Sequence, residues 1–187
     1  MENICDYKIC TGCGLCVSEC PKRCISLVRR GSLGHLFTKI DSLICNDCGL
    51  CKKNCPAICG TKYNTIRTAY AAWSKDDEEY RNSASGGAAS VFSEYVVSKG
   101  GIVYGCAMLP DINVKHIRVD NLKDVTKLKG SKYVQSSIVE VIPQLKDDVK
   151  FGRTTLFIGT PCQVAAIKSL YKVLLNSIYN DLDESQL

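Results

Sequence analysis

The spacing of cysteines constrains this chain more than any other feature. Four of them form one run, and the same spacing recurs in a second run about thirty-five residues later. The first run is Cys10, Cys13, Cys16 and Cys20, and the second is Cys45, Cys48, Cys51 and Cys55. A proline, Pro21 or Pro56, follows each run and turns the chain away, because proline carries no amide hydrogen to continue a helix. The first part of the chain must therefore fold around whatever its sulfur atoms bind.

The repeated pattern C-x2-C-x2-C-x3-C-P is typical of bacterial ferredoxins. In two-cluster ferredoxins the fourth cysteine of each run binds the other cluster, which ties the two halves together. We therefore expect two 4Fe-4S clusters. The expected ligands of the first cluster are Cys10, Cys13, Cys16 and Cys55. The expected ligands of the second cluster are Cys45, Cys48, Cys51 and Cys20.

Two other uses of cysteine fit the sequence less well. Paired C-x-x-C segments also bind zinc, but a zinc site needs four donors, whereas each run offers three closely spaced thiols and a fourth before a proline. Disulfides fit poorly because the thirteen cysteines are an odd number and no secretory apolar segment follows Met1. A reducing, cytoplasmic location is expected.

Three further cysteines lie close to these runs. Cys24 and Cys59 each follow the fourth cysteine of their run by four positions, so we expect them at equivalent places beside the two clusters. Packing is expected for both, because a free cysteine behaves as a small apolar side chain. Cys5 precedes the first run and is also expected to bind no metal.

Length and composition indicate two domains. With 187 residues the chain suits one small domain, predicted at 1–60, and one medium domain, predicted at 61–187. No apolar stretch is long enough for a membrane helix, so no direct membrane insertion is expected. The net charge of +5 is modest and acidic residues are mixed among the basic ones, which does not favour nucleic-acid binding.

Strands and helices are expected to alternate after the cluster domain. A hairpin strand is predicted at 35–41 within the first domain. Strands are predicted at 65–73, 102–107, 114–119 and 154–158, and helices at 87–99, at 138–149 with an interruption near Pro143, and from about Gln163. The predicted fold class is an α+β ferredoxin-like two-cluster domain followed by an α/β domain.

Side-chain patterns place residues on shared faces of two of these elements. In the helix at 87–99, Val91, Phe92, Tyr95 and Val96 share one face. In the strand at 114–119, His116 and Arg118 point the same way. We expect that face to be solvated, and the alternative is that it looks towards the turns at 83–87, 130–133 and 159–163.

Three turns rich in small residues have exposed backbone amides that could hold phosphate oxygens. They are Ser83 to Gly87, Gly130 to Tyr133 and Gly159 to Gln163. Ordinary helix capping and chain reversal also account for each turn taken alone. Beside iron clusters, a flavin could convert single electrons into hydride, and Lys132 would then neutralise a phosphate or the reduced ring. Cys162 is a candidate for cofactor contact or redox chemistry, because a helix N-terminus makes a thiol more reactive; structural burial is the alternative.

Four phrases of the sequence resemble the coenzyme F420 hydrogenase/dehydrogenase beta subunits. They are NSASGG at 82–87, GGIVYGCA at 100–107, KGSKYVQS at 129–136 and LFIGTPCQVAA at 156–166. The resemblance extends from the first cysteine run to about Leu170. It implies an oxidoreductase with iron-sulfur clusters and FAD, which moves electrons between a partner subunit or ferredoxin and a deazaflavin coenzyme or another soluble hydride acceptor.

The resemblance also implies a flavin site and a departure from the family. Carried over to matching positions, the flavin-site candidates are Ser85, Gly86, Gly87, Ser131, Lys132, Tyr133, Thr160, Pro161, Cys162 and Gln163. The family's flavin domain continues well beyond the GTPCQ phrase, whereas this chain ends at Leu187, so we expect a shortened, incomplete α/β domain. The alternative function is a non-catalytic ferredoxin-type electron-transfer module.

Overall fold

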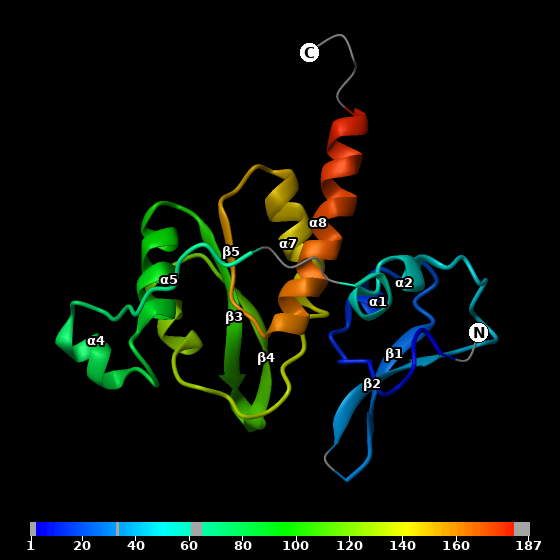
Figure 1. The fold of residues 1–187 in the computed structure, drawn as a ribbon, viewed down its shortest axis with the longest axis horizontal. Coiled ribbons are helices and arrows are strands. Elements are labelled where there is room, and N and C mark those ends of the chain that lie inside the picture. Colours follow the sequence, from blue (N-terminus) through cyan, green and yellow to red (C-terminus); the bar gives the residue numbers. More distant parts are fainter. Residues whose placement is uncertain (1–2, 33, 61–64, 182–187) are drawn as a thin grey trace. The chain divides into compact units, whose positions relative to one another are not determined.

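The structure is a computed structural model that describes residues 3–32, 34–60 and 65–181, with the backbone alone for Asp111 and for 172–181. Its residues form two compact units (Figure 1). The first unit comprises Met1–Thr61 and Thr160–Leu187, and the second comprises Lys62–Gly159. The predicted domain boundary after residue 60 falls next to Thr61, which lies outside the described residues, and it stays a prediction.

The two cysteine runs have the same local conformation. Gly14 and Gly49 have positive φ angles of 83° and 75°, which glycine adopts without strain. A four-residue helix follows each of them, α1 (Leu15–Ser18) and α2 (Leu50–Lys53). The repeat in sequence is therefore a repeat in structure.

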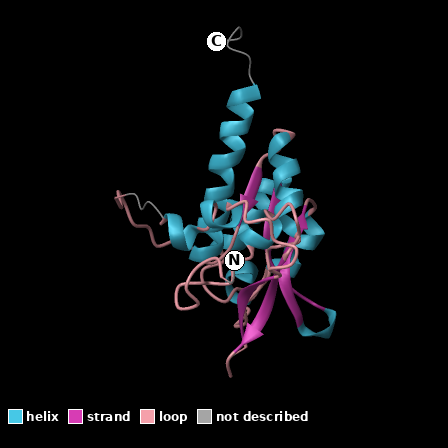
Figure 2. Ribbon diagram, turned by 90° about the vertical axis from the view of Figure 1, so that its right-hand side faces the viewer, coloured by secondary structure: helices cyan, strands magenta, loops and turns pink. Residues whose placement is uncertain are grey.

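A β-hairpin separates the two runs. Strands β1 (Ile25–Arg30) and β2 (His35–Ile40) pair antiparallel, with Ile25 opposite Ile40 (Figure 2). Gly31 and Gly34 both have positive φ angles in the turn, where the Gly34 amide donates to the Gly31 carbonyl oxygen at 3.2 Å. The strand predicted at 35–41 is confirmed as β2. Its partner strand β1 was not predicted from the sequence.

Two further helices complete the first unit. Helix α3 (Pro56–Cys59) begins at the proline after the second run, and α8 (Pro161–Asp181) packs against α1 and α3. Among the side chains of α8 that the structure describes, Gln163, Ala166, Ile167 and Leu170 are buried. This helix begins two residues earlier than the sequence predicted, because proline is well tolerated at the first helical position.

The second unit is built on a three-stranded sheet with the order β4-β3-β5. Strand β3 (Ile102–Leu109) pairs antiparallel with β4 (Asn113–Val119) through the short 3₁₀ helix η1 (Pro110–Ile112), and parallel with β5 (Thr155–Phe157). The three strands lie where the sequence predicted them. The unit is a mixed α/β body with a small sheet, in agreement with the expected class.

Helices cover both faces of this sheet (Figure 1). Val103 of β3 packs with residues of α5 (Ala88–Ser98) and α6 (Leu122–Val125), the latter followed by the 3₁₀ helix η2 (Thr126–Leu128). The next residue, Tyr104, points the other way, because its hydroxyl donates to Asp148 of α7 (Val141–Lys150) at 2.5 Å. Alternation along β3 thus divides the unit into three layers.

Helix α5 lies where the sequence predicted it. Of the residues on its shared face, Phe92 and Tyr95 are more than 60 % exposed, whereas Val96 packs in part against the core. Two predictions about elements of the second unit are wrong. Residues 65–73 form no strand and are exposed. Helix α7 is continuous, since Pro143 lies in its first turn, where no intrahelical hydrogen bond is lost.

The face of β4 that was expected to be solvated is covered. His116 is buried, and its ring stacks on Phe157 with centroids 5.2 Å apart. Arg118 donates from Nε to Asp148 Oδ2 at 2.8 Å, and Arg153 donates from Nη1 to Asp148 Oδ1 at 2.7 Å. Helix α7 covers this face, so the polar residues of β4 take part in a buried network.

A short helix, α4 (Asp77–Asn82), precedes the first of the three small-residue turns. The Asp76 carboxylate caps it by accepting a hydrogen bond from the Glu79 amide at 2.8 Å. Within the part of the chain that the structure describes, no helix has both the length and the apolar character needed to cross a membrane.

Candidate metal centres

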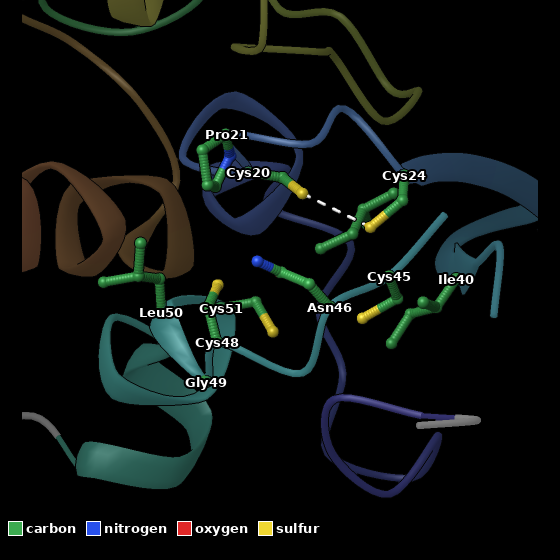
Figure 3. Close-up of a pocket in the computed structure, with 11 residues that line it drawn as sticks. Cys20, Pro21, Cys24, Ile40, Cys45, Asn46, Cys48, Gly49, Leu50 and Cys51 are labelled. Atoms are coloured by element: carbon green, nitrogen blue, oxygen red, sulfur yellow. Dashed lines mark hydrogen bonds between the residues drawn. The ribbon is translucent and has the colours of Figure 1, made fainter. Parts of the chain in front are cut away.

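The four cysteines expected to hold the second cluster line one pocket (Figure 3). Three come from the second run and its helix α2, and Cys20 comes from the end of the first run. The other residues around the pocket are Pro21, Cys24, Ile25, Ile40, Asn46, Gly49 and Leu50. The apolar strand ends Ile25 and Ile40 form part of the wall, while the Cys48 side of the quartet is exposed.

The four cysteines expected to hold the first cluster also lie close to one another. The Cys16 thiol interacts electrostatically with those of Cys13, Cys55 and Cys10. Burial raises the pKa of Cys16, and these neighbouring sulfurs raise it further. The quartet therefore combines three cysteines of the first run with the last cysteine of the second.

Backbone amides point at several of these sulfurs. Burial raises the pKa of the Cys20 thiol, but hydrogen bonds from the backbone of Cys24, Lys22 and Arg23 outweigh it and lower the pKa. The backbone of Leu15 donates to Cys13 in the same manner, although burial keeps the pKa of Cys13 raised. Hydrogen bonds to sulfur stabilise thiolates and are among the factors that set the potential of iron-sulfur clusters.

The donor set fits an iron-sulfur cluster by its chemistry. Each quartet contains thiols alone, and after the turns at Gly14 and Gly49 the backbone of Leu15 donates to Cys13 and that of Lys52 to Cys51. Within residues 3–32, 34–60 and 65–181, no group of three or more cysteine, histidine or carboxylate side chains is close enough together to hold a single metal ion. A 4Fe-4S cluster binds one thiolate at each of its four irons, so its ligands lie farther apart than the ligands of a single metal ion.

Each quartet has an additional cysteine beside it. Cys24 Sγ lies 3.4 Å from Cys20 Sγ and interacts with the Cys45 thiol, and the Cys5 thiol interacts with those of Cys10 and Cys55. Burial, with the neighbouring thiols adding to it, raises the pKa of each to about 12. The expected equivalence of Cys24 with Cys59 is wrong, because Cys59 is exposed and its Sγ lies 3.0 Å from the carbonyl oxygen of Lys53.

The flavin-site candidates before α5 form a turn held by Glu79. Ser85 is exposed, whereas Gly87 is buried and has a φ of 79° at the start of the helix. A side chain on Gly86 would place its Cβ 2.5 Å from the Ala72 carbonyl oxygen, so only glycine fits. The N-cap residue Gly87 has no side chain to cap α5, and Glu79 lies beside the start of this helix, near Gly87 and Ser90.

The candidates Ser131, Lys132 and Tyr133 lie in a loop that is joined to the same glutamate. Lys129 forms an ion pair with Glu79, which connects this loop to the turn before α5. The Lys132 ammonium is occupied, because it donates to the carbonyl oxygens of Leu128 and Lys129 at 3.0 and 2.6 Å. Burial lowers the pKa of Lys132, and nearby Cys106 partly offsets the shift. Ser131 and Tyr133 are exposed.

The last four candidates belong to the first unit. The Gln163 side-chain oxygen accepts a hydrogen bond from the Thr160 amide at 2.9 Å, which caps α8. Pro161 is exposed at the first position of the helix. The Thr160 hydroxyl lies 3.2 Å from Cys162 Sγ, and Cys162 is near enough to Cys13 to raise the pKa of that thiol slightly. Cys162 thus lies beside the first quartet.

Comparison with known protein families gives one finding. Residues 9–59, about a quarter of the chain, match the family described as the 4Fe-4S dicluster domain. The search of curated proteins gives no match to this chain. The matched segment contains both cysteine runs, so this part of the chain is an iron-sulfur domain of the ferredoxin type.

Proposed function

We propose that the chain transfers electrons through two 4Fe-4S clusters. Cys10, Cys13, Cys16 and Cys55 would hold one, and Cys45, Cys48, Cys51 and Cys20 the other. The observation that carries this proposal is the crosswise assembly of each quartet from three cysteines of one run and the last cysteine of the other. When bound, such clusters supply one-electron carriers whose potentials depend on hydrogen bonding and solvent exposure.

The two quartets differ in how exposed their cysteines and neighbouring residues are. The first quartet has the buried Cys16 at its centre and is flanked by α1 and Cys162. The second quartet includes the exposed Cys48 and has Leu43 and Ile44, both exposed, just before it in the chain. A redox partner protein or subunit would therefore exchange electrons at the second quartet, where an apolar surface is free to dock.

We further propose that the second unit binds FAD and exchanges hydride with a soluble acceptor. Support comes from the glycine-rich turn at the start of α5 and from the connection of that turn to the loop at 130–133 through Glu79. Ser85, Gly86 and Gly87 are then the main contacts, with Ser131 and Tyr133 on the adjoining loop. Lys132 has one donor left after its two carbonyl contacts.

The alternative is a ferredoxin-type carrier without catalysis, and specific contacts favour it. Gln163 is used in capping α8, and Lys132 is used in closing its own loop. Cys162 lies beside a cluster ligand. Three residues offered for the flavin, Lys132, Cys162 and Gln163, therefore have a local structural or cluster-related role.

Anaerobic reconstitution of the full chain tests both proposals. We expect about eight irons per chain, with Cys20→Ser and Cys55→Ser each holding about half as many. Zinc bound in preference to iron, or iron binding that survives both substitutions together, would refute the cluster proposal. Flavin that remains bound through gel filtration and is reduced by the clusters supports the second proposal, and clusters without flavin support the carrier.

A further inference from the structure

The second quartet reaches the protein surface at Cys48, which is the exposed member of the eight expected cluster ligands. Three exposed apolar residues lie close to it in the chain, with Leu43 96 %, Ile44 52 % and Leu50 39 % exposed. Leu50 also lines the pocket of this quartet (Figure 3). We call these three residues the exposed apolar patch. Apolar side chains gathered beside a site in this way are typical of a surface that contacts another molecule.

Two pairs of basic residues border the same pocket. The first pair is Lys22 and Arg23, and the second pair is Lys52 and Lys53. Each pair directly follows a residue that lines the pocket, one from each cysteine run. All four basic side chains are exposed. The second pair also suits the C-terminal end of α2, but the first pair lies outside any helix, so the charge of a helix end does not account for it.

Basic side chains outnumber acidic ones around the second quartet. Within three positions of its four cysteines the sequence has four basic residues and two acidic ones, Glu19 and Asp47. A cluster held by four thiolates is itself negative, and the excess of basic side chains offsets that charge at the surface. A negatively charged protein would otherwise be repelled from the cluster. The two basic pairs instead favour its approach.

We propose that the exposed apolar patch, together with the two basic pairs, docks a small acidic protein that carries single electrons. This inference rests on the proposed function and deepens it by naming the chemistry of the redox partner. The patch packs against the partner, and the basic pairs face its carboxylates. One electron passes between the docked carrier and the cluster, so that one of them is oxidised and the other reduced by one electron, with no bond broken and no proton moved.

The test measures how tightly an acidic plant-type ferredoxin binds the reconstituted full chain, by titration calorimetry with both proteins oxidised. Lys22→Glu and Lys52→Glu should each weaken binding about fivefold at low salt, because the reversed charge repels the partner. In about 1 M salt, where the Debye length is about 3 Å, both variants should bind like the unsubstituted chain. Leu43→Ser should weaken binding about tenfold at either salt concentration, because it removes apolar area from the interface.

Arg30→Glu is the matched control. Arg30 is exposed at one end of β1, and Ile25 at the other end lines the pocket. The strand has six residues, so the two positions lie roughly 17 Å apart. The same reversal of charge at Arg30 should leave binding within about twofold of that of the unsubstituted chain. An equal loss from Arg30→Glu and Lys22→Glu would refute docking at this surface, because only the overall charge would then matter.

Further outcomes separate this inference from the proposed function. A chain that takes up no iron refutes the proposed function itself. A chain that holds about eight irons but binds the ferredoxin no more tightly than a basic c-type cytochrome refutes the acidic partner alone. Self-association of the loaded chain that Leu43→Ser abolishes also refutes it, because a second copy would then cover the patch.

Glutamine variants keep the test decisive if a glutamate variant does not take up iron. Lys22→Gln and Lys52→Gln remove a positive charge without adding a negative one. Each should weaken binding of the ferredoxin about twofold at low salt and leave it unchanged in about 1 M salt. Unchanged binding at low salt in both glutamine variants would refute the role of the basic pairs.

Discussion

The two units differ in what fills their interiors. One buried cluster of the first unit has three cysteines among its six residues, namely Cys16, Cys24 and Cys51, and three further cysteines and Val17 pack around it. The corresponding cluster of the second unit consists of valines from helices and strands, and other buried positions of that unit hold large apolar side chains such as Ile142 and Leu145 beside an ionic network. Sulfur atoms thus occupy places in the first unit that apolar side chains fill in the second. Folding of the first unit should therefore depend on what those atoms bind.

Removal of iron should have the largest effect and act on one unit alone. Anaerobic chelation is expected to unfold the described residues of the first unit, while the sheet of the second unit stays folded. Amide hydrogen exchange, measured by mass spectrometry before and after chelation, checks this. Peptides of β1 and β2 should lose protection, and peptides of β3 and β4 should keep it. Protection retained at β1 and β2 would contradict the dependence on metal.

The stability of the second unit should depend on Asp148. Its carboxylate is buried and accepts hydrogen bonds from Tyr104, Arg118 and Arg153. Asp148→Ala leaves Arg118 without its buried partner and should reduce the free energy of unfolding of this unit by about 3 kcal/mol. Chemical denaturation followed by hydrogen exchange at β3 measures it. The exposed neighbour is the control, since Asp147→Ala should change stability by less than about 0.5 kcal/mol. Equal effects of the two would refute the network.

Acid should weaken the second unit through His116. Burial lowers the pKa of His116, although its hydrogen bond to the Ile158 carbonyl oxygen opposes the shift. Because the ring is held neutral in the folded state, its contribution is full above the unfolded pKa of about 6.5 and is lost as pH falls through the lower folded pKa. The loss should reach about 1.4 kcal/mol for each pH unit in that window.

Chemical denaturation of the second unit at a series of pH values between about 8 and 5, the range in which histidine changes its charge, checks this prediction. His116→Gln should flatten the dependence, and His35→Gln, at an exposed position of the first unit, should leave it unchanged. A dependence that persists in His116→Gln would assign it to another group.

The repeated cysteine spacing predicted which cysteines lie near one another, and short apolar runs predicted the three strands of the sheet, because both signals can be seen directly in the sequence. The contacts of Cys5 were not predictable in this way, since they depend on how the chain before the first run folds back onto Cys55 from the second. The turn at Gly86 was visible as a small-residue run, but its reason, close contact with the backbone at Ala72, lies fourteen residues away. The extended residues 65–73 have strand-forming composition but no neighbouring strand among the described residues.

Helix α5 illustrates the same limit, because an apolar stripe does not show which side of a helix faces the sheet. The buried residues of α5 are Ser93 and Val97. The Ser93 hydroxyl donates a hydrogen bond to the Ala89 carbonyl oxygen at 2.7 Å. Such a hydrogen bond removes the cost of burying the hydroxyl. Serine therefore fits at a buried position of α5, and Phe92 lies on the outer face.

This arrangement predicts the smallest effect, at a residue that composition would place in the core. Phe92 is 61 % exposed, so Phe92→Ser should change the free energy of unfolding of the second unit by less than about 0.5 kcal/mol. Serine and phenylalanine have similar helix propensities, which removes that contribution. Val97→Ala, at a buried position of the same helix, should cost about 2 kcal/mol through lost burial and a cavity. Chemical denaturation of the two variants side by side measures both, and a larger loss from Phe92→Ser than from Val97→Ala would mean that the outer face of α5 is packed.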